Sequence, residues 1–225
     1  MENVKEYVVK IIDIRQITHN VKRFRFEKPK GYKYAPGQAT EVSINKKEWE
    51  KEKRPFTFTC LNDEDFLEFT IKIYFDHKGL TNQIGKLEVG DFITIREPFG
   101  TIKYKEKGVF IAGGAGITPF IAIFRQLYKH NNLKGNKLIF SNNSEKDIIL
   151  KEELEKMFGR DCLFILTKEK TRGFKYGFVN AEFLKSKINS FIQHFYICGP
   201  PQMVVDLKRI LESFGAKVEN IVFEE

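Results

Sequence analysis

The stretch Val109-Phe110-Ile111-Ala112-Gly113-Gly114-Ala115-Gly116-Ile117-Thr118-Pro119 joins an apolar run, a glycine-rich turn and the start of an expected helix. Glycine lets the backbone approach a bound group closely, and proline is tolerated where the N–H groups at a helix start are free. Because such N–H groups bind anions, the turn is typical of a site for a nucleotide pyrophosphate. It differs from the GxGxxG fingerprint, and no Lys-Ser/Thr pair follows to make a Walker loop.

From residue 108 onward, buried apolar runs alternate with helical patterns. The expected strands are 109–112, 137–140, 163–166, 195–198 and 221–223, and the expected helices are 116–130, 148–158, 180–188 and 202–214. This alternation predicts an α/β doubly wound parallel sheet. Ligands of such domains bind outside the carboxyl ends of the strands.

The first half of the chain is rich in short β-like runs separated by turn residues. The expected strands are 8–14, 22–26, 39–44, 54–60, 67–74 and 92–96, with one helix at 80–87. Short strands at this spacing predict an antiparallel β-barrel. We therefore expect two domains, 1–104 and 105–225, joined by a short linker near Tyr104 to Gly108.

Arg54-Pro55-Phe56-Thr57 lies on one of the expected barrel strands and suits a flavin. Arg54 offers a planar guanidinium to phosphate oxygens. Side chains alternate along a strand, so one of Phe56 and Thr57 can pack along the cofactor while the other places a polar group at the ring edge. An ordinary edge strand with a proline is the other interpretation.

Two further motifs can each be functional or structural. Gly79-Leu80-Thr81-Asn82 opens the helix of the barrel half and forms either an anion site or a simple helix cap. Cys198-Gly199-Pro200-Pro201 ends the fourth expected parallel strand, so its thiol is expected near the glycine turn across the ligand crevice. A buried structural cysteine is the alternative for Cys198, and no neighbouring histidine marks it as a nucleophile.

In this order and spacing the motifs resemble the ferredoxin–NADP reductase superfamily, particularly its bacterial flavodoxin/ferredoxin reductase-like members. The resemblance covers essentially the whole chain and implies FAD on the barrel domain, with NAD(P)H as co-substrate of the α/β domain. Arg54, Phe56 and Thr57 would contact the flavin's phosphates, ring system and N5. The implied cofactor contacts are Arg54, Pro55, Phe56, Thr57, Ile71, Lys72, Ile73, Tyr74, Gly79, Leu80 and Thr81 for FAD, and Gly113, Gly114, Ala115, Gly116, Ile117, Thr118, Pro119, Cys198, Gly199 and Pro200 for NAD(P)H.

Thr57, Cys198 and Glu224 are the implied reaction-centre residues, and two departures from the family pattern accompany them. Relatives often end in an aromatic residue that stacks on the flavin, whereas this chain ends Phe223-Glu224-Glu225, so that lid is expected to be absent. Relatives that prefer NADP place arginine and serine after the second parallel strand. This chain has Ser141-Asn142-Asn143-Ser144-Glu145 there, with Lys146, Lys170 and Arg172 as possible substitutes, so NAD versus NADP stays open.

The net charge and the cysteine and histidine content of the chain indicate which partners and cofactors to expect. The 225 residues carry a formal charge of +8, which fits an acidic electron-transfer protein such as ferredoxin or flavodoxin, or nucleic acid. No aromatic–basic platform is present, so we expect no nucleic-acid partner. Three separated cysteines and four scattered histidines predict neither a disulfide framework nor a metal or iron–sulfur site.

Nothing in the sequence predicts a membrane partner. No segment approaches the roughly 18 consecutive apolar residues that span a bilayer. The first residues lack the apolar core of a secretory signal, so a cytoplasmic protein is expected. The oligomeric state is not predicted.

The leading hypothesis is a flavin-dependent NAD(P)H oxidoreductase, in which hydride passes to FAD and electrons leave to ferredoxin, flavodoxin or another acceptor. One alternative keeps the fold but makes the chain an electron-transfer subunit of a larger oxidoreductase complex. Another is a reductase that uses free flavin as a substrate. A hypothesis from a different class, a noncatalytic basic barrel that binds nucleic acid, leaves the glycine turn and the Cys198 segment unexplained.

Overall fold

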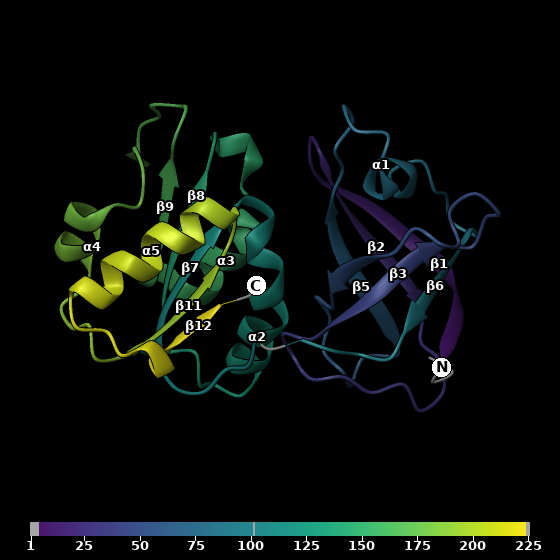
Figure 1. Cartoon of the computed structure of the whole chain (residues 1–225), viewed down its shortest axis with the longest axis horizontal. Helices are drawn as coiled ribbons and strands as arrows, with labels where there is room; N and C mark the ends of the chain where they lie inside the picture. The colour runs from purple at the N-terminus through teal and green to yellow at the C-terminus, as the bar shows by residue number, and fades with distance from the viewer. Residues whose placement is uncertain (1–4, 101, 224–225) are drawn as a thin grey trace. The chain divides into compact units, whose positions relative to one another are not determined.

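The computed structural model describes residues 5–100 and 102–223 (Figure 1). The expected reaction-centre residue Glu224 therefore lies outside the described residues. The described residues form two compact units: unit 1 comprises residues 5–100 and 118–126, and unit 2 comprises residues 102–117 and 127–223.

The strands of unit 1 form an antiparallel sheet that bends towards a barrel. They are β1 (Glu6–Thr18), β2 (Val21–Glu27), β3 (Ala39–Ile44), β4 (Arg54–Thr57), β5 (Phe66–Lys72) and β6 (Phe92–Arg96), in the order β4-β3-β6-β1-β2-β5. An antiparallel bridge between Phe58 and Phe69 connects the chain just after β4 to β5, at the other edge of the order. The predicted antiparallel barrel architecture is confirmed.

Aromatic side chains fill the interior of unit 1. Phe24 and Phe26 alternate with partly buried residues along β2, as expected for a strand with one face on a core. Phe58 and Phe69 pack 5.1 Å apart between ring centroids. β1 pairs with β6 through residues 6–10 and with β2 through residues 11–18, and the second segment contains two register shifts.

Three segments of unit 1 end earlier than the sequence pattern predicts. The strand expected to reach Cys60 ends at Thr57. Phe58 N still bonds to Gln38 O, beside β3, but Thr59 N bonds to Glu68 O of β5, so the chain changes its neighbouring strand at this point. β5 ends at Lys72, and α1 (Leu80–Ile84) stops at Gly85. An added Cβ at Gly85 would lie 2.7 Å from Ile73 Cγ2, so the helix end packs closely on the barrel.

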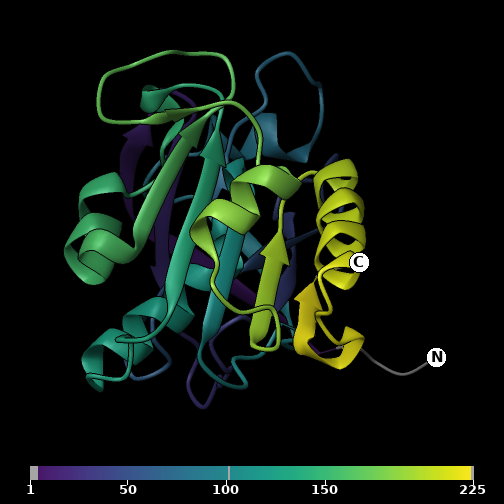
Figure 2. The ribbon, with the colours of Figure 1, turned by 90° about the vertical axis from the view of Figure 1, so that its left-hand side faces the viewer.

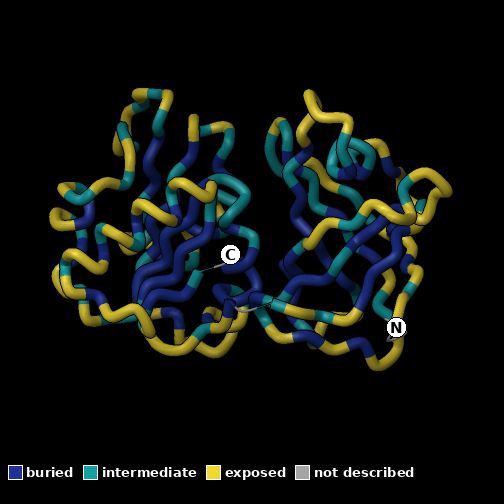
Figure 3. Tube along the Cα trace, in the orientation of Figure 1, coloured by how far each residue is buried: buried dark blue, intermediate teal, exposed yellow. Residues whose placement is uncertain are grey.

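Unit 2 is a parallel sheet with helices, as predicted (Figure 2). Its strands are β7 (Gly108–Gly113), β8 (Lys137–Asn142), β9 (Cys162–Leu166), β10 (Lys175–Tyr176), β11 (His194–Cys198) and β12 (Ile221–Phe223), in the order β10-β9-β8-β7-β11-β12. Its helices are α3 (Lys151–Phe158), α4 (Ala181–Lys187) and α5 (Pro201–Ser213), and α2 (Thr118–Lys129) runs from unit 1 into unit 2. The central strands are buried, which explains their continuous apolar runs (Figure 3).

Two helix starts in this half differ from the sequence prediction. Residues 114–117 form a 3-10 turn, so α2 begins at Thr118 rather than Gly116. α3 begins at Lys151 rather than Ile148, because Leu150 adopts a left-handed conformation with φ 54°. The short strand β10 was not predicted, since its two residues are exposed and carry no apolar run.

The described residues form neither a membrane-spanning helix nor a metal-binding cluster. Within this part of the chain, no helix is long and apolar enough to cross a membrane. No group of three or more His, Cys, Asp or Glu side chains among the same residues is placed to hold a metal ion.

Candidate flavin and dinucleotide sites

The glycine turn and the Cys198 segment lie side by side at the carboxyl edge of the parallel sheet. β7 pairs with β11, with Ala112 opposite Cys198, and it pairs with β8, with Gly113 opposite Ser141. The turn therefore leaves the sheet between the ends of two neighbouring strands. This is the edge where open α/β sheets bind their ligands.

Two glycines of the turn are required by packing rather than by backbone conformation. A Cβ on Gly116 would lie 2.3 Å from the carbonyl oxygen of Cys198. A Cβ on Gly113 would lie 2.6 Å from Met203 Sδ. Gly114 is different, because it has φ +53° and nothing within 4 Å of an added Cβ. The turn is thus packed against β11 and α5 at two positions and open at the third.

Cys198 lies at the end of β11, with 8% of its surface exposed. The chain then passes through Gly199 and Pro200 into α5, which starts at Pro201. Proline at a helix start fixes the backbone where no intrahelical bond is lost. Rigid neighbours on both sides hold the Cys198 segment in place beside the turn.

The side-chain amide of Asn142, at the carboxyl end of β8, is buried and has no hydrogen-bond partner among the described residues. Both polar atoms of its amide are inaccessible to solvent, and neither has a partner among the described residues. A buried amide without partners is costly, and such groups in native proteins usually meet a water or a ligand. Sequence analysis noted the segment 141–145 but gave Asn142 no role. The orphaned amide at this edge fits a polar ligand bound there.

A fixed carboxylate lies at the same edge, near the ends of β8 and β9. Glu169 accepts hydrogen bonds from Thr171 Oγ1 at 2.7 Å and from the backbone N–H of Glu145 at 2.9 Å. Both bonds lower the pKa of Glu169 below its usual value, and the bond from Thr171 has the larger effect. Glu169 is therefore ionised at neutral pH. Sequence analysis considered only the basic residues of this loop and missed it.

The expected flavin strand is exposed at Arg54 and Pro55, partly buried at Phe56 and buried at Thr57. Phe56 packs against the core of unit 1, with its ring centroid 6.3 Å from that of Phe69. Thr57 is only 9% exposed, and none of the described residues hydrogen-bonds to its hydroxyl. The side chain of Arg54 is 59% exposed, and its nearest carboxylate, Glu52, lies 4.0 Å away. An exposed guanidinium without a close acidic partner fits a phosphate.

The other expected flavin residues follow β5 and open α1. Ile73 is buried, and its N–H bonds to Asn20 O, whereas Tyr74 is exposed beside Lys72. Gly79 precedes α1 with extended backbone, and a Cβ there would meet nothing within 4 Å. Leu80 is buried and anchors the helix in the core. The space beside Gly79 is therefore open, directly before a helix start that the buried Leu80 fixes to the core.

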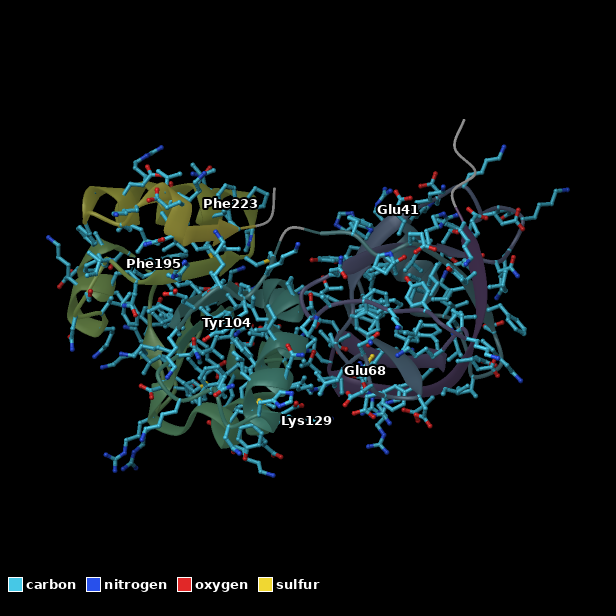
Figure 4. All side chains as sticks on the ribbon, turned by 90° about the horizontal axis from the view of Figure 1, so that it is seen from below. Glu41, Glu68, Tyr104, Lys129, Phe195 and Phe223 are labelled. Atoms are coloured by element: carbon cyan, nitrogen blue, oxygen red, sulfur yellow. The ribbon has the colours of Figure 1, made fainter. Side chains whose placement is uncertain are left out.

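Glu68 of β5, labelled in Figure 4, is the centre of a buried ionic cluster that the sequence patterns did not predict. Glu68 is 1% exposed and is surrounded by Arg23, Arg25 and Arg125. The sequence offered two signals. One is a glutamate between Leu67 and Phe69, and the other is an arginine directly after the apolar run Phe120 to Phe124. Charged residues are rarely buried unless they are paired.

Comparison with known proteins identifies the two units. Residues 8–104 match the oxidoreductase FAD-binding domain family, and residues 110–209 match the oxidoreductase NAD-binding domain family. The protein is thus an FAD- and NAD-binding oxidoreductase. It belongs to the ferredoxin–NADP reductase superfamily, as the resemblance of its motifs implied.

Relatives and solved structures cover most of the chain. NADH-cytochrome b5 reductase 2-A of Vanderwaltozyma polyspora is 30% identical over 84% of this chain and 69% of its own length. NADH-cytochrome b5 reductase 1 of Bos taurus is 28% identical over 89% of this chain and 79% of its own length. The structure of a ferredoxin NADP+ reductase from Neisseria gonorrhoeae with bound FAD and NADP has a TM-score of 0.85 at 20% identity and covers 99% of both chains, which shows a shared fold.

Proposed function

We propose that this protein is a reductase that oxidises NADH with FAD as its bound cofactor and delivers the electrons to an acidic electron-transfer protein. FAD, when bound, accepts a hydride from C4 of the nicotinamide at N5 and releases electrons singly or in pairs. The observation that carries the proposal is the glycine turn seated against the Cys198 segment in a domain of the NAD-binding family.

Residues of unit 1 would hold the flavin. The exposed guanidinium of Arg54 would pair with the phosphates. Thr57, whose hydroxyl lacks a partner within the described chain, would hydrogen-bond to N5, with Pro55 and Phe56 shaping the strand beside the ring. The backbone of Ile71, Lys72, Ile73 and Tyr74 and the open helix start at Gly79, Leu80 and Thr81 would complete the site.

Residues of unit 2 would hold the dinucleotide. The backbone N–H groups of the turn from Gly113 to Pro119 would bind the pyrophosphate. Cys198, Gly199 and Pro200 would lie by the nicotinamide and restrict its orientation, which is how a protein accelerates hydride transfer without a chemical role of its own. Glu224, outside the described residues, is proposed as an acidic group near the same centre.

We propose NADH rather than NADPH as the electron donor. Glu169 would accept a hydrogen bond from a ribose hydroxyl and repel a 2′-phosphate, as the acidic residue of dinucleotide-binding folds does. The segment 141–145 contains no arginine. The names of the yeast and bovine relatives, which are NADH reductases, support the same choice.

The net charge of the chain suggests the class of its electron acceptor. A formal charge of +8 favours an acidic partner and fast, salt-sensitive association. Ferredoxin and flavodoxin are acidic carriers of this kind, and the names of the relatives point to a cytochrome b5 as a third. We also propose a cytoplasmic location and a domain boundary at residues 104 and 105, where the match to the FAD-binding family ends.

Anaerobic spectroscopy tests the proposed function. The purified protein is expected to be yellow, to release FAD on denaturation, and to lose its flavin absorbance on addition of NADH. The rate with ferricyanide, ferredoxin, flavodoxin and cytochrome b5 as acceptors then ranks the partners, and rising salt should slow the reduction of the acidic protein acceptors. A colourless protein that takes up no flavin on reconstitution would rule the proposal out.

A further inference from the structure

A pocket of about 440 Å³ lies within unit 1, where the loop after β3 meets the end of helix α1. Its volume is in the range of about 300–1,000 Å³ that is usual for binding pockets. None of the residues expected to hold FAD or the dinucleotide lines it. The pocket is therefore a second feature of unit 1, separate from the flavin strand and from the helix start at Gly79.

Three apolar side chains line the pocket. Ile44, at the end of β3, and Leu87, just after α1, are buried. Trp49, the single tryptophan of the chain, is partly buried and packs against the same hydrophobic core. A buried tryptophan usually finds a hydrogen-bond partner for its indole N–H, but that of Trp49 has none among the described residues. The pocket thus offers an aromatic surface with a free donor.

The polar lining of the pocket carries more positive than negative charge. It consists of Lys46, Lys47, Glu48, Gln83 and Lys86. Lys46 Nζ lies 3.5 Å from Asp91 Oδ1, which partly offsets its charge. Lys47 and Lys86 are exposed, and neither forms an ion pair within the described part of the chain. Two ammonium groups are therefore free to pair with carboxylates beside the aromatic surface.

The pocket is close enough to the flavin strand for one partner protein to cover both. Ala39 of β3 pairs with Thr57 of β4, and Ile44 lies five residues further along β3. At about 3.4 Å per residue, this separation is about 17 Å. A standard protein interface covers about 800 Å² on each partner, which is roughly 30 Å across. A protein that fills the pocket therefore also lies beside the strand proposed to hold the flavin.

The character of the lining favours a protein as the occupant. Small-molecule sites fix their ligands with a few precisely placed polar groups, whereas Lys47 and Lys86 are exposed charges on flexible stems. Tryptophan is enriched among the residues that carry most of the energy of protein interfaces, and exposed charges around it steer the partner. Trp49 is the only aromatic residue of the lining, which is not the stacking platform that nucleic acid requires.

We propose that this pocket is the docking site for the acidic electron-transfer protein, which places an apolar side chain against Trp49 and pairs its carboxylates with Lys47 and Lys86. The inference rests on the proposed function and names the surface that its electron acceptor contacts. The pocket takes no part in holding FAD or NADH. Loss of the two charges or of the indole should therefore weaken binding of the carrier and leave flavin reduction by NADH unchanged.

The experiment compares three variants of the holoenzyme. Lys47→Glu/Lys86→Glu reverses both free charges, and Trp49→Ala removes the indole. The control, Lys156→Glu/Lys217→Glu, makes the same change in net charge at exposed positions of unit 2. For each protein, calorimetry gives the Kd for oxidised ferredoxin, flavodoxin and cytochrome b5, and anaerobic stopped flow gives the rate of flavin reduction by NADH.

We expect the Kd for the carrier that binds wild type most tightly to rise at least about tenfold in Lys47→Glu/Lys86→Glu and in Trp49→Ala. The control should raise it less than about threefold, because charges beyond the Debye length are screened. Added salt should weaken binding of the carrier to wild type much more than to Lys47→Glu/Lys86→Glu. All three variants should reduce their flavin with NADH at the wild-type rate.

The outcomes separate this inference from the proposed function. An unchanged Kd in Lys47→Glu/Lys86→Glu, or an equal loss in the control, would overturn the inference alone. If Trp49→Ala does not fold, the charge variant decides, since its changes lie on exposed side chains. Self-association of wild type in sedimentation that the charge variant abolishes would overturn the inference in favour of a second copy of the chain.

Two further results concern the wild-type protein. If none of the three carriers binds while NADH reduces the flavin, the inference falls and the proposed flavin chemistry stands. If NADH does not reduce the flavin, the proposed function falls and the inference falls with it.

Discussion

Gly116 lies directly against the carbonyl of Cys198, and the contact leaves no room for a side chain. A Cβ on Gly116 would lie 2.3 Å from that oxygen and 2.6 Å from the backbone nitrogen of Gly199. The neighbours are backbone atoms, which cannot rotate away as a long side chain can. Gly116 therefore sets how closely the glycine turn approaches the end of β11.

Gly116→Ala should force the turn and the Cys198 segment apart. We expect a loss of about 1–3 kcal/mol in the free energy of unfolding, as for other overpacked sites. The Kd for NAD+ should weaken at least about tenfold, which corresponds to roughly 1.4 kcal/mol of binding free energy. Urea unfolding and calorimetric titration measure the two effects. The control is Gly159→Asn, at φ +54° in open space, where asparagine tolerates the left-handed region.

Thr57→Val should slow flavin reduction while keeping the shape of the side chain. The hydroxyl has no partner among the described residues, so its removal should leave the free energy of unfolding unchanged. A lost hydrogen bond of about 1 kcal/mol predicts a roughly fivefold slower reduction by NADH. Thr57→Ser, which keeps the hydroxyl, should stay near the wild-type rate. Equal impairment of both variants would show that the hydroxyl is not the cause.

Glu169→Lys should shift the enzyme's preference from NADH towards NADPH. The substitution removes a carboxylate held by Thr171 and by the backbone of Glu145, and it adds a charge that attracts a 2′-phosphate. We expect the ratio of kcat/KM for NADH to that for NADPH to fall about tenfold or more. This corresponds to a change of at least roughly 1.4 kcal/mol in the free-energy preference for NADH. Glu152→Lys, at an exposed position of α3, makes the same change in net charge and should leave the ratio constant.

Glu68→Gln should destabilise the protein in a pH-dependent way. The folded-state pKa of Glu68 is lowered below 4.5, so its ionisation stabilises the fold above that pH, and the contribution is lost as pH falls through the folded-state pKa. At pH 7 the variant should lose about 3 kcal/mol or more, because Arg125 and Arg25 lose their partner. The gap between variant and wild type in urea unfolding should narrow below pH 4.5. A gap that stays constant with pH, or that Glu64→Gln reproduces, would contradict the assignment.

Local sequence patterns were sufficient for elements whose residues carry their own signal. The strands at 39–44, 92–96 and 221–223 have the predicted bounds, because apolar alternation and turn residues mark both ends. The architecture of both units followed from the same patterns, and the motifs pointed to the superfamily before the comparisons confirmed it. In contrast, the end of β4 at Thr57 depends on hydrogen bonds to Gln38 and Glu68, which no local pattern reveals.

The sequence by itself determined that a glycine turn follows a buried strand, that Arg54 and Thr57 lie on a barrel strand, and that a cysteine ends a later parallel strand. Only the tertiary structure decided that Gly116 packs on the carbonyl of Cys198, that the side-chain amide of Asn142 is buried without a partner among the described residues, and that Arg125 reaches Glu68. The physical reason is distance along the chain. Hydrophobic periodicity reports which face of each element is buried, whereas a close backbone approach or an ion pair between residues 57 positions apart depends on how the elements pack.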